Sequence, residues 1–150
     1  MKVLREFAGV EHRLEFVKDI KGVSYYNDSK GTNTDATLIA IRALKNDIIL
    51  IAGGDAKSQD FTEMAKELSG PVKHVALFGR DRGMIKEAMD KAGYTSYSEH
   101  ADLEECVRYA AGIAEPGDKV LLSPACASWD MYPNFEVRGS HFKDCVGRLE

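Results

Sequence analysis

A polar stretch near the start of the chain, residues 27–33 (Asn-Asp-Ser-Lys-Gly-Thr-Asn), places a carboxylate, an ammonium group and several hydroxyl and amide oxygens close together. It follows a strand-like run, residues 23–26, and leads into an apolar-periodic run that begins at Thr34. Open α/β sheets bind ligands in loops of this kind, and the helix dipole behind such a loop favours an anion. A capped helix start without a ligand is the alternative, because Asn33 or Thr34 would make a good N-cap.

A second candidate loop follows the continuous apolar run of residues 47–52 and reads Gly53-Gly-Asp-Ala-Lys-Ser58. It is similar to the phosphate-binding pattern G-x-x-x-x-G-K-[ST], but Ala56 stands where that pattern requires glycine, and the loop is too short. The loop can still present Lys57 and Ser58 at the carboxyl end of a strand. Without a ligand, Lys57 would be an ordinary solvent-exposed charge.

A third candidate loop, residues 123–130 (Ser-Pro-Ala-Cys-Ala-Ser-Trp-Asp), follows the apolar run 119–122. Its small residues leave room for a ligand, and Ser128 offers a hydroxyl group. Cys126 is a poor candidate for a nucleophile, because the sequence shows no base beside it and buried inert thiols are more common.

The elements that would position these loops follow from apolar periodicity and turn residues. We expect strands at residues 14–20, 23–26, 47–52, 72–78, 94–97 and 119–122. We expect helices at residues 34–44, 61–68, 85–92, 102–114 and 135–149, with Gly139 weakening the first half of the last one. This order predicts an α/β fold: a doubly wound, mostly parallel, Rossmann-like sheet of about six strands, with strand 14–20 antiparallel at one edge and helices on both faces.

Composition narrows the function classes. The 150 residues fit one domain, and a net charge of −4 without a basic cluster predicts no nucleic-acid partner. We expect no membrane association, because no apolar run approaches the roughly 20 residues that span a bilayer. The three cysteines have no metal-ligand spacing, which predicts reduced thiols in a cytoplasmic protein. His74 and His100 also lack metal-ligand spacing, so no metal site is expected.

Four motifs together resemble the C-terminal domain of the Mur ligases, from about His12 to the C-terminus. They are Asn-Asp-Ser-Lys-x-Thr-Asn, Gly-Gly-Asp-x-Lys-Ser, Phe-Gly-Arg-Asp, and Leu-Ser-Pro-Ala-Cys-Ala-Ser followed by Asn-Phe-Glu-x-Arg-Gly. On this resemblance, residues 12–150 form the amino-acid-binding domain and residues 1–11 a linker from an upstream central domain.

The resemblance also implies roles for individual residues. The residues implied near the nucleotide are His12, Arg13, Asp28 and Lys30, with Arg13 and Asp28 at the ATP ribose and Lys30 at the phosphates. The residues implied at D-glutamate are Thr32, Lys57, Ser128, Trp129 and Phe135, with Lys57 on a carboxylate and Phe135 as an apolar wall. Trp129 stands where the family has a smaller apolar residue, so the resemblance does not define the shape of the pocket. Arg80 of the third motif is expected to fix its loop.

The resemblance is to the branch of the family that adds D-glutamate to UDP-N-acetylmuramoyl-L-alanine, through an acyl phosphate, in peptidoglycan precursor synthesis. It implies ATP and Mg²⁺, bound mainly by a central domain outside this sequence. The chain alone would therefore be inactive and has no catalytic residue of its own. The alternatives are a later Mur ligase, a folylpolyglutamate synthase, or a standalone ligand-binding domain. On the first interpretation we expect Arg13, Asp28 and Lys30 to be exposed on the sheet's carboxyl edge, near Lys57 and Ser128.

Overall fold

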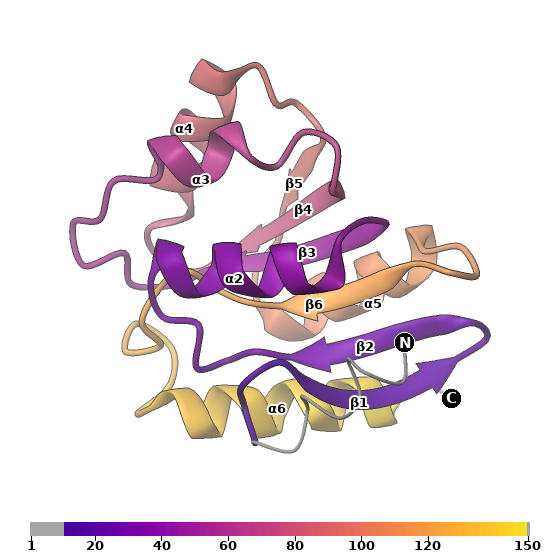
Figure 1. Cartoon of the computed structure of the whole chain (residues 1–150). Coiled ribbons are helices and arrows are strands. Elements are labelled where there is room, and N and C mark those ends of the chain that lie inside the picture. The colour runs from indigo at the N-terminus through magenta and orange to yellow at the C-terminus, as the bar shows by residue number, and fades with distance from the viewer. Residues whose placement is uncertain (1–10, 150) are drawn as a thin grey trace.

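The computed structural model describes residues 11–149, which fold around a six-stranded sheet of order β1-β2-β6-β3-β4-β5 (Figure 1). The expected linker lies, except for Glu11, outside the described residues. The strands are β1 (Glu15–Ile20), β2 (Val23–Asn27), β3 (Ile48–Gly53), β4 (Val72–Phe78), β5 (Tyr97–Glu99) and β6 (Lys119–Leu122). The helices are α2 (Thr34–Leu44), α3 (Thr62–Lys66), α4 (Arg82–Ala92), α5 (Leu103–Ile113) and α6 (Phe135–Gly147).

The sheet confirms the expected topology. β1 pairs with β2 in the antiparallel sense at one edge, and every other strand pair is parallel. Helices α2, α3 and α4 pack on one face and α5 and α6 on the other, each group over its own buried apolar cluster (Figure 1). β3 lies at the centre and is buried along its whole length, as its continuous apolar sequence predicts. Within residues 11–149, no helix is both long and apolar enough to span a bilayer.

The fifth strand begins later than expected, at Tyr97 and not at residue 94. Tyr94 instead closes helix α4: its N–H donates to the Met89 carbonyl, and its hydroxyl donates to the Val72 carbonyl at 2.8 Å. Gly93 ends that helix in the left-handed conformation, at a φ of 81°. The residues after it are therefore used to end the helix, which periodicity alone does not reveal.

The order of the strands reverses beside β3. The chain runs outward from β3 to β4 and β5, and then returns to place β6 on the other side of β3. The carboxyl ends of β3 and β6 therefore form a topological switch point, the usual ligand position in such sheets. Gly53, the last residue of β3, allows a close contact with the neighbouring end of β4: it has a φ of +133°, and a Cβ atom on it would lie 1.8 Å from the Phe78 carbonyl oxygen.

Gly139 has a packing role that the sequence did not reveal. Although it lies inside α6, a Cβ atom at this position would come within 2.1 Å of His12 Nδ1 and 3.0 Å of Asn27 Nδ2. The loss of helix propensity at this glycine is thus offset by the close approach of a buried histidine. The glycine lets α6 pack against the start of the β1–β2 hairpin.

We predict that Gly139→Ala lowers the free energy of unfolding by about 1–3 kcal/mol, because the added methyl group overpacks the His12 contact. Gly147→Ala is the matched control in the same helix, since nothing lies within 4 Å of a Cβ atom there. It should leave stability unchanged or raise it slightly. Chemical denaturation of both variants measures the difference, and equal stability of the two would contradict the packing role.

Candidate functional site

A pocket of about 530 Å³ opens beside the β2–α2 loop. Five of the expected site residues line it: Arg13, Asp28, Lys30, Thr32 and Phe135. Three of the four residues expected at a nucleotide and two of the five expected at D-glutamate therefore share one pocket. Asn33, which caps α2 by accepting the Ala36 N–H at 2.8 Å, turns the chain beneath it. The loop is thus both a capped helix start and a pocket wall.

Asp28 corrects one expectation, because it is buried, with 5% of its surface exposed. One carboxylate oxygen accepts the Leu14 N–H at 2.9 Å, and the other accepts the Ser123 hydroxyl at 2.7 Å. Burial raises its pKa to about 6, against the opposing effects of these hydrogen bonds and of two arginines. Arg13 and Lys30 are exposed, as expected.

His12 lies behind the pocket and is 4% exposed. The amide nitrogen of Asn27 lies 2.9 Å from Nδ1, and the imidazole edge packs against the Phe135 ring at 6.1 Å. An amide N–H₂ group only donates, so Nδ1 accepts and the proton is on Nε2. His12 is thus placed to support Phe135, and it does not line the pocket.

The cluster of Glu11, His12 and Glu15 has atoms close enough to be considered for a metal ion. The Lys143 ammonium group already lies 2.7 Å from Glu11 Oε2 and 3.3 Å from Glu15 Oε2. With its proton on Nε2, His12 directs no lone pair at Glu11, 3.6 Å away. The Lys143 ammonium group therefore lies where a metal ion would have to bind between the two carboxylates.

The loops that carry Lys57 and Ser128 are joined at the switch point. The backbones of Asp55 and Ala127 exchange two hydrogen bonds, of 2.9 and 2.8 Å. Lys57 is exposed and has a φ of +52°, the left-handed region that non-glycine residues rarely adopt. Its N–H donates to Asp55 Oδ1 at 3.1 Å, which fixes this turn. Strained backbone of this kind is concentrated at functional sites.

Ser128 is 2% exposed, and its hydroxyl oxygen has no hydrogen-bond partner among the described residues. An unpaired buried hydroxyl costs roughly 1–3 kcal/mol, so it calls for a physical explanation. Trp129, the next residue, is 71% exposed. The Ser128 hydroxyl is thus a buried hydrogen-bonding group without a partner among the described residues, and it lies beside the loop of Lys57.

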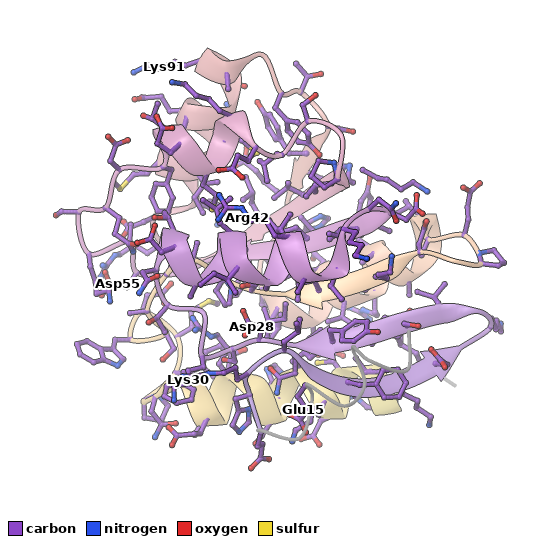
Figure 2. The ribbon with its side chains drawn as sticks, viewed as in Figure 1. Glu15, Asp28, Lys30, Arg42, Asp55 and Lys91 are labelled. Atoms are coloured by element: carbon purple, nitrogen blue, oxygen red, sulfur yellow. The ribbon has the colours of Figure 1, made fainter. Side chains whose placement is uncertain are left out.

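Gln59 is a site-forming residue that sequence reasoning missed. Its Nε2 donates to the carbonyls of Ala56 at 2.9 Å and Ala125 at 3.0 Å, and its Oε1 accepts the Thr34 N–H at 3.0 Å. One side chain thus joins all three candidate loops. Lys30 and Lys57 accordingly lie at the same edge, and Figure 2 shows Asp28, Lys30 and Asp55 at that end of the sheet. A lone glutamine in a polar loop carries no sequence signal for this role.

Arg138 was also missed, although it belongs to a recognised motif. Its side chain is fully buried. Nε donates to Ser29 Oγ at 2.9 Å, Nη2 to the Ser29 carbonyl at 2.7 Å, and Nη1 to the Cys126 carbonyl at 3.0 Å. Burial lowers its pKa to about 10, so the guanidinium stays charged near neutral pH. It connects the loop of Asp28 to the loop of Ser128.

The structure agrees with the expectations for Arg80 and Cys126. Arg80 fixes its loop: Nη2 lies 3.0 Å from Asp55 Oδ1, and its N–H donates to Asp130 Oδ2 at 2.9 Å. Cys126 is buried, and burial raises the pKa of its thiol to about 12, which favours the unreactive thiol form as expected.

We predict that Asp28→Asn changes how stability depends on pH. A carboxyl group whose pKa is raised from 3.8 to about 6 favours folding below its unfolded pKa and loses that contribution as pH rises through 6. Relative to the parent, the variant should therefore gain on the order of 2–3 kcal/mol between about pH 4 and about pH 7. Asp60→Asn is the control with the opposite sign, because hydrogen bonds from Thr62 lower the pKa of Asp60. A flat difference for Asp28→Asn in denaturation across this range would contradict the assignment.

We predict that Arg138→Met lowers the free energy of unfolding by on the order of 3 kcal/mol or more, because Ser29 and Cys126 keep buried acceptors without donors. Hydrogen exchange should quicken in residues 27–33 and 123–134. Arg148→Met removes a half-exposed arginine just after the same helix and should cost little. Protection of the two loops in Arg138→Met equal to that in the parent would show that the guanidinium does not couple them.

Comparison with known proteins supports the family resemblance. The family model of the Mur ligase glutamate ligase domain matches residues 12–126. A UDP-N-acetylmuramoylalanine–D-glutamate ligase from Alkaliphilus metalliredigens is 55% identical over 99% of this chain and 32% of its own length. The enzyme of the same name from Caldicellulosiruptor saccharolyticus is 51% identical over 99% of the chain and 33% of its length. The chain thus spans about a third of these relatives.

Solved structures agree on the fold. The UDP-N-acetylmuramate–alanine ligase of Thermotoga maritima superposes on 99% of this chain and 33% of its own, with a TM-score of 0.65 at 16% identity. The bifunctional folylpolyglutamate synthase/dihydrofolate synthase of Yersinia pestis covers 94% of this chain and 31% of its own, with a TM-score of 0.63 at 16% identity. The fold, the shared pocket and the family match lead to one conclusion: this chain belongs to the Mur ligase glutamate ligase domain family.

Proposed function

We propose that this chain is the amino-acid-binding domain of an ATP-dependent ligase that joins D-glutamate to UDP-N-acetylmuramoyl-L-alanine in peptidoglycan precursor synthesis. The observation that carries the proposal is the buried hydroxyl of Ser128, which has no hydrogen-bond partner among residues 11–149 and lies beside the strained loop of Lys57. A hydroxyl donor and a cation together suit a carboxylate, and the sequence relatives of about 50% identity are D-glutamate ligases by name.

The amino-acid site would use residues from all three loops. Lys57 would form a charge-assisted hydrogen bond with one carboxylate of D-glutamate. The Ser128 hydroxyl and the Trp129 backbone would also contact a carboxylate of this substrate. Thr32 and Phe135, both half-buried in the lining of the pocket, would supply a hydroxyl group and an apolar wall. Gln59 holds the loops in register, so the cation and the hydroxyls are positioned before the ligand arrives.

The nucleotide would lie in the same pocket, on the side of Arg13, Asp28 and Lys30. Asp28 is the one carboxylate in the described lining, and both its oxygens already accept hydrogen bonds. The Asp28 carboxylate suits the hydroxyl groups of a ribose, and the exposed Lys30 suits phosphates. A single carboxylate that already accepts two hydrogen bonds does not suit Mg²⁺. Any Mg²⁺ would therefore be held mainly by groups other than those that line this pocket. His12 would act through its contact with Phe135.

The contribution of the chain to such a reaction would be to position the attacking amine. ATP would convert the UDP-linked carboxylate to an acyl phosphate, and the amine of D-glutamate would displace the phosphate. Lys57 and Ser128 would hold the D-glutamate carboxylates, so that the amine faces the acyl carbon. Lys30 would offset charge at the phosphoryl groups.

The fold alone would also fit a ligase for another amino acid or a standalone binding domain. Alanine-adding and folylpolyglutamate ligases share it at 16% identity, so the fold does not select the amino acid. A standalone binding domain would need no partner.

The free, buried cysteines Cys106, Cys126 and Cys145 suit the reducing cytoplasm in which we place the reaction.

The test uses a chimaera of the Alkaliphilus metalliredigens ligase in which this chain replaces the matching third. Removal of a charge-assisted hydrogen bond costs roughly 1.5–3 kcal/mol, so Lys57→Ala should raise the KM for D-glutamate by about ten- to 150-fold. The KM for ATP should change little, because the nucleotide would be held by Arg13, Asp28 and parts outside this chain. Lys66→Ala, which removes an exposed lysine of α3, is the control and should change neither constant.

Steady-state kinetics with D-glutamate and ATP varied separately decide the question. An unchanged KM for D-glutamate in Lys57→Ala, or a loss confined to ATP, would sink the proposed role of the lysine. A chimaera that folds but ligates no D-glutamate would overturn the proposed substrate.

A further inference from the structure

Three polar residues, His74, Ser98 and His100, form a row on β4 and β5, at the side of the sheet opposite the β1–β2 hairpin. Ser98 lies on β5 opposite Ala76 of β4, so its side chain shares a face with His74, two residues before Ala76. His100 follows Ser98 by two residues on the same face. This face is the one that α5 covers, because Ala76 packs in the same apolar cluster as the α5 residue Val107.

The hydrogen bonds among these side chains are continuous. Ser98 Oγ lies 2.8 Å from His74 Nε2 and 2.7 Å from His100 Nε2, and His100 Nδ1 lies 3.3 Å from Glu105 Oε1 of α5. His100 is 9% exposed. Glu105 also accepts the Ala101 N–H at 3.1 Å, which anchors its carboxylate at the start of the helix.

The carboxylate sets the direction of these bonds when His100 is neutral. An ionised carboxylate only accepts, so neutral His100 carries its proton on Nδ1 and presents a lone pair at Nε2. The Ser98 hydroxyl then donates to His100, and His74 Nε2 donates to Ser98. A serine that donates to an imidazole, which in turn donates to a carboxylate, is the arrangement of an activated nucleophile, its base and the group that orients the base.

We propose that Ser98 is the nucleophile of a second reactive site, with His100 as its general base and Glu105 as the orienting carboxylate, and that the site takes small activated esters with an apolar or aromatic acyl group. The Tyr109 ring lies 4.7 Å from the His100 ring and 5.4 Å from the His74 ring, and is 37% exposed. Ile113, one helical turn further along α5, is 39% exposed. The Tyr109 ring is thus an apolar surface beside the two imidazoles that contact the serine.

The chemical step is an acyl transfer. Ser98 Oγ bonds to the ester carbonyl carbon while its proton passes to His100 Nε2, and the bond from that carbon to the leaving oxygen then breaks. The proton on His100 goes to the leaving alkoxide, or to solvent when the leaving group is a phenolate. Attack by water on the acyl-serine releases the carboxylic acid and regenerates the hydroxyl.

His74 donates its N–H to the serine oxygen and so orients the hydroxyl proton toward His100. Burial lowers the pKa of His74, and the neighbouring His100 lowers it further, which favours the neutral form of His74. The site shares no residue with the pocket at the β2–α2 loop, and its test is independent of ligase activity.

The experiment uses the whole 150-residue chain with p-nitrophenyl acetate. Release of p-nitrophenolate is followed by absorbance, and the acetylated residue is located by mass spectrometry of peptides. Acetylation should occur at Ser98, and Ser98→Ala should abolish that adduct. His100→Gln should slow acylation of Ser98 by about 100-fold, the lower range for loss of a positioned base.

Ser96→Ala is the matched control, because Ser96 is exposed just before β5, and the hydrogen bonds of the two imidazoles go to Ser98 and Glu105. It should react like the parent, and circular dichroism checks that each variant is folded. Acetylation of lysines alone, with Ser98 unmodified in the parent chain, would overturn the proposal. So would an Ser98 acylation rate in His100→Gln equal to that of the parent. Peptide mapping of the parent is decisive even if a variant fails to fold.

Discussion

The buried guanidinium of Arg138 is the interaction on which the candidate site depends. A charge inside a protein is tolerated only when hydrogen bonds replace the lost water, and here Ser29 and the Cys126 carbonyl provide them. The requirement works in both directions. The arginine needs the loops after β2 and β6 at fixed positions, and those loops need the arginine to satisfy their inward-facing oxygens. Helix α6, which carries Arg138, thus belongs to the site although it lines little of the pocket.

Much of the architecture could be predicted from the sequence, because strand and helix positions follow from apolar periodicity that burial then reproduces. The continuous run of β3 and the reversal of strand order at β6 placed the three loops at one edge. The exceptions arose where a residue serves two elements. Tyr94 ends a helix and delays a strand, and the penalty for helical Gly139 is offset by contact with His12, a partner far away in the chain.

The residue types of the candidate site could be predicted more readily than the contacts that hold them together. Charged and hydroxyl residues near the strand ends carry a recognisable pattern, and four of them line one pocket together with Phe135. The residues that join the loops, Gln59 and Arg138, have no such signal, because their role lies in contacts to backbone oxygens distant in sequence. The burial of Asp28 was unpredicted for the same reason, since its partners, the Leu14 N–H and the Ser123 hydroxyl, lie just before β1 and just after β6.

A carboxyl group that titrates near pH 6 in a pocket wall has a calorimetric consequence. A ligand whose hydroxyl groups donate to Asp28 binds the ionised form, so in mildly acidic solution its arrival expels a proton. The buffer takes up that proton with its own enthalpy of ionisation. The heat measured on binding will therefore differ between buffers of equal pH, and the size of the difference counts the protons that Asp28 releases.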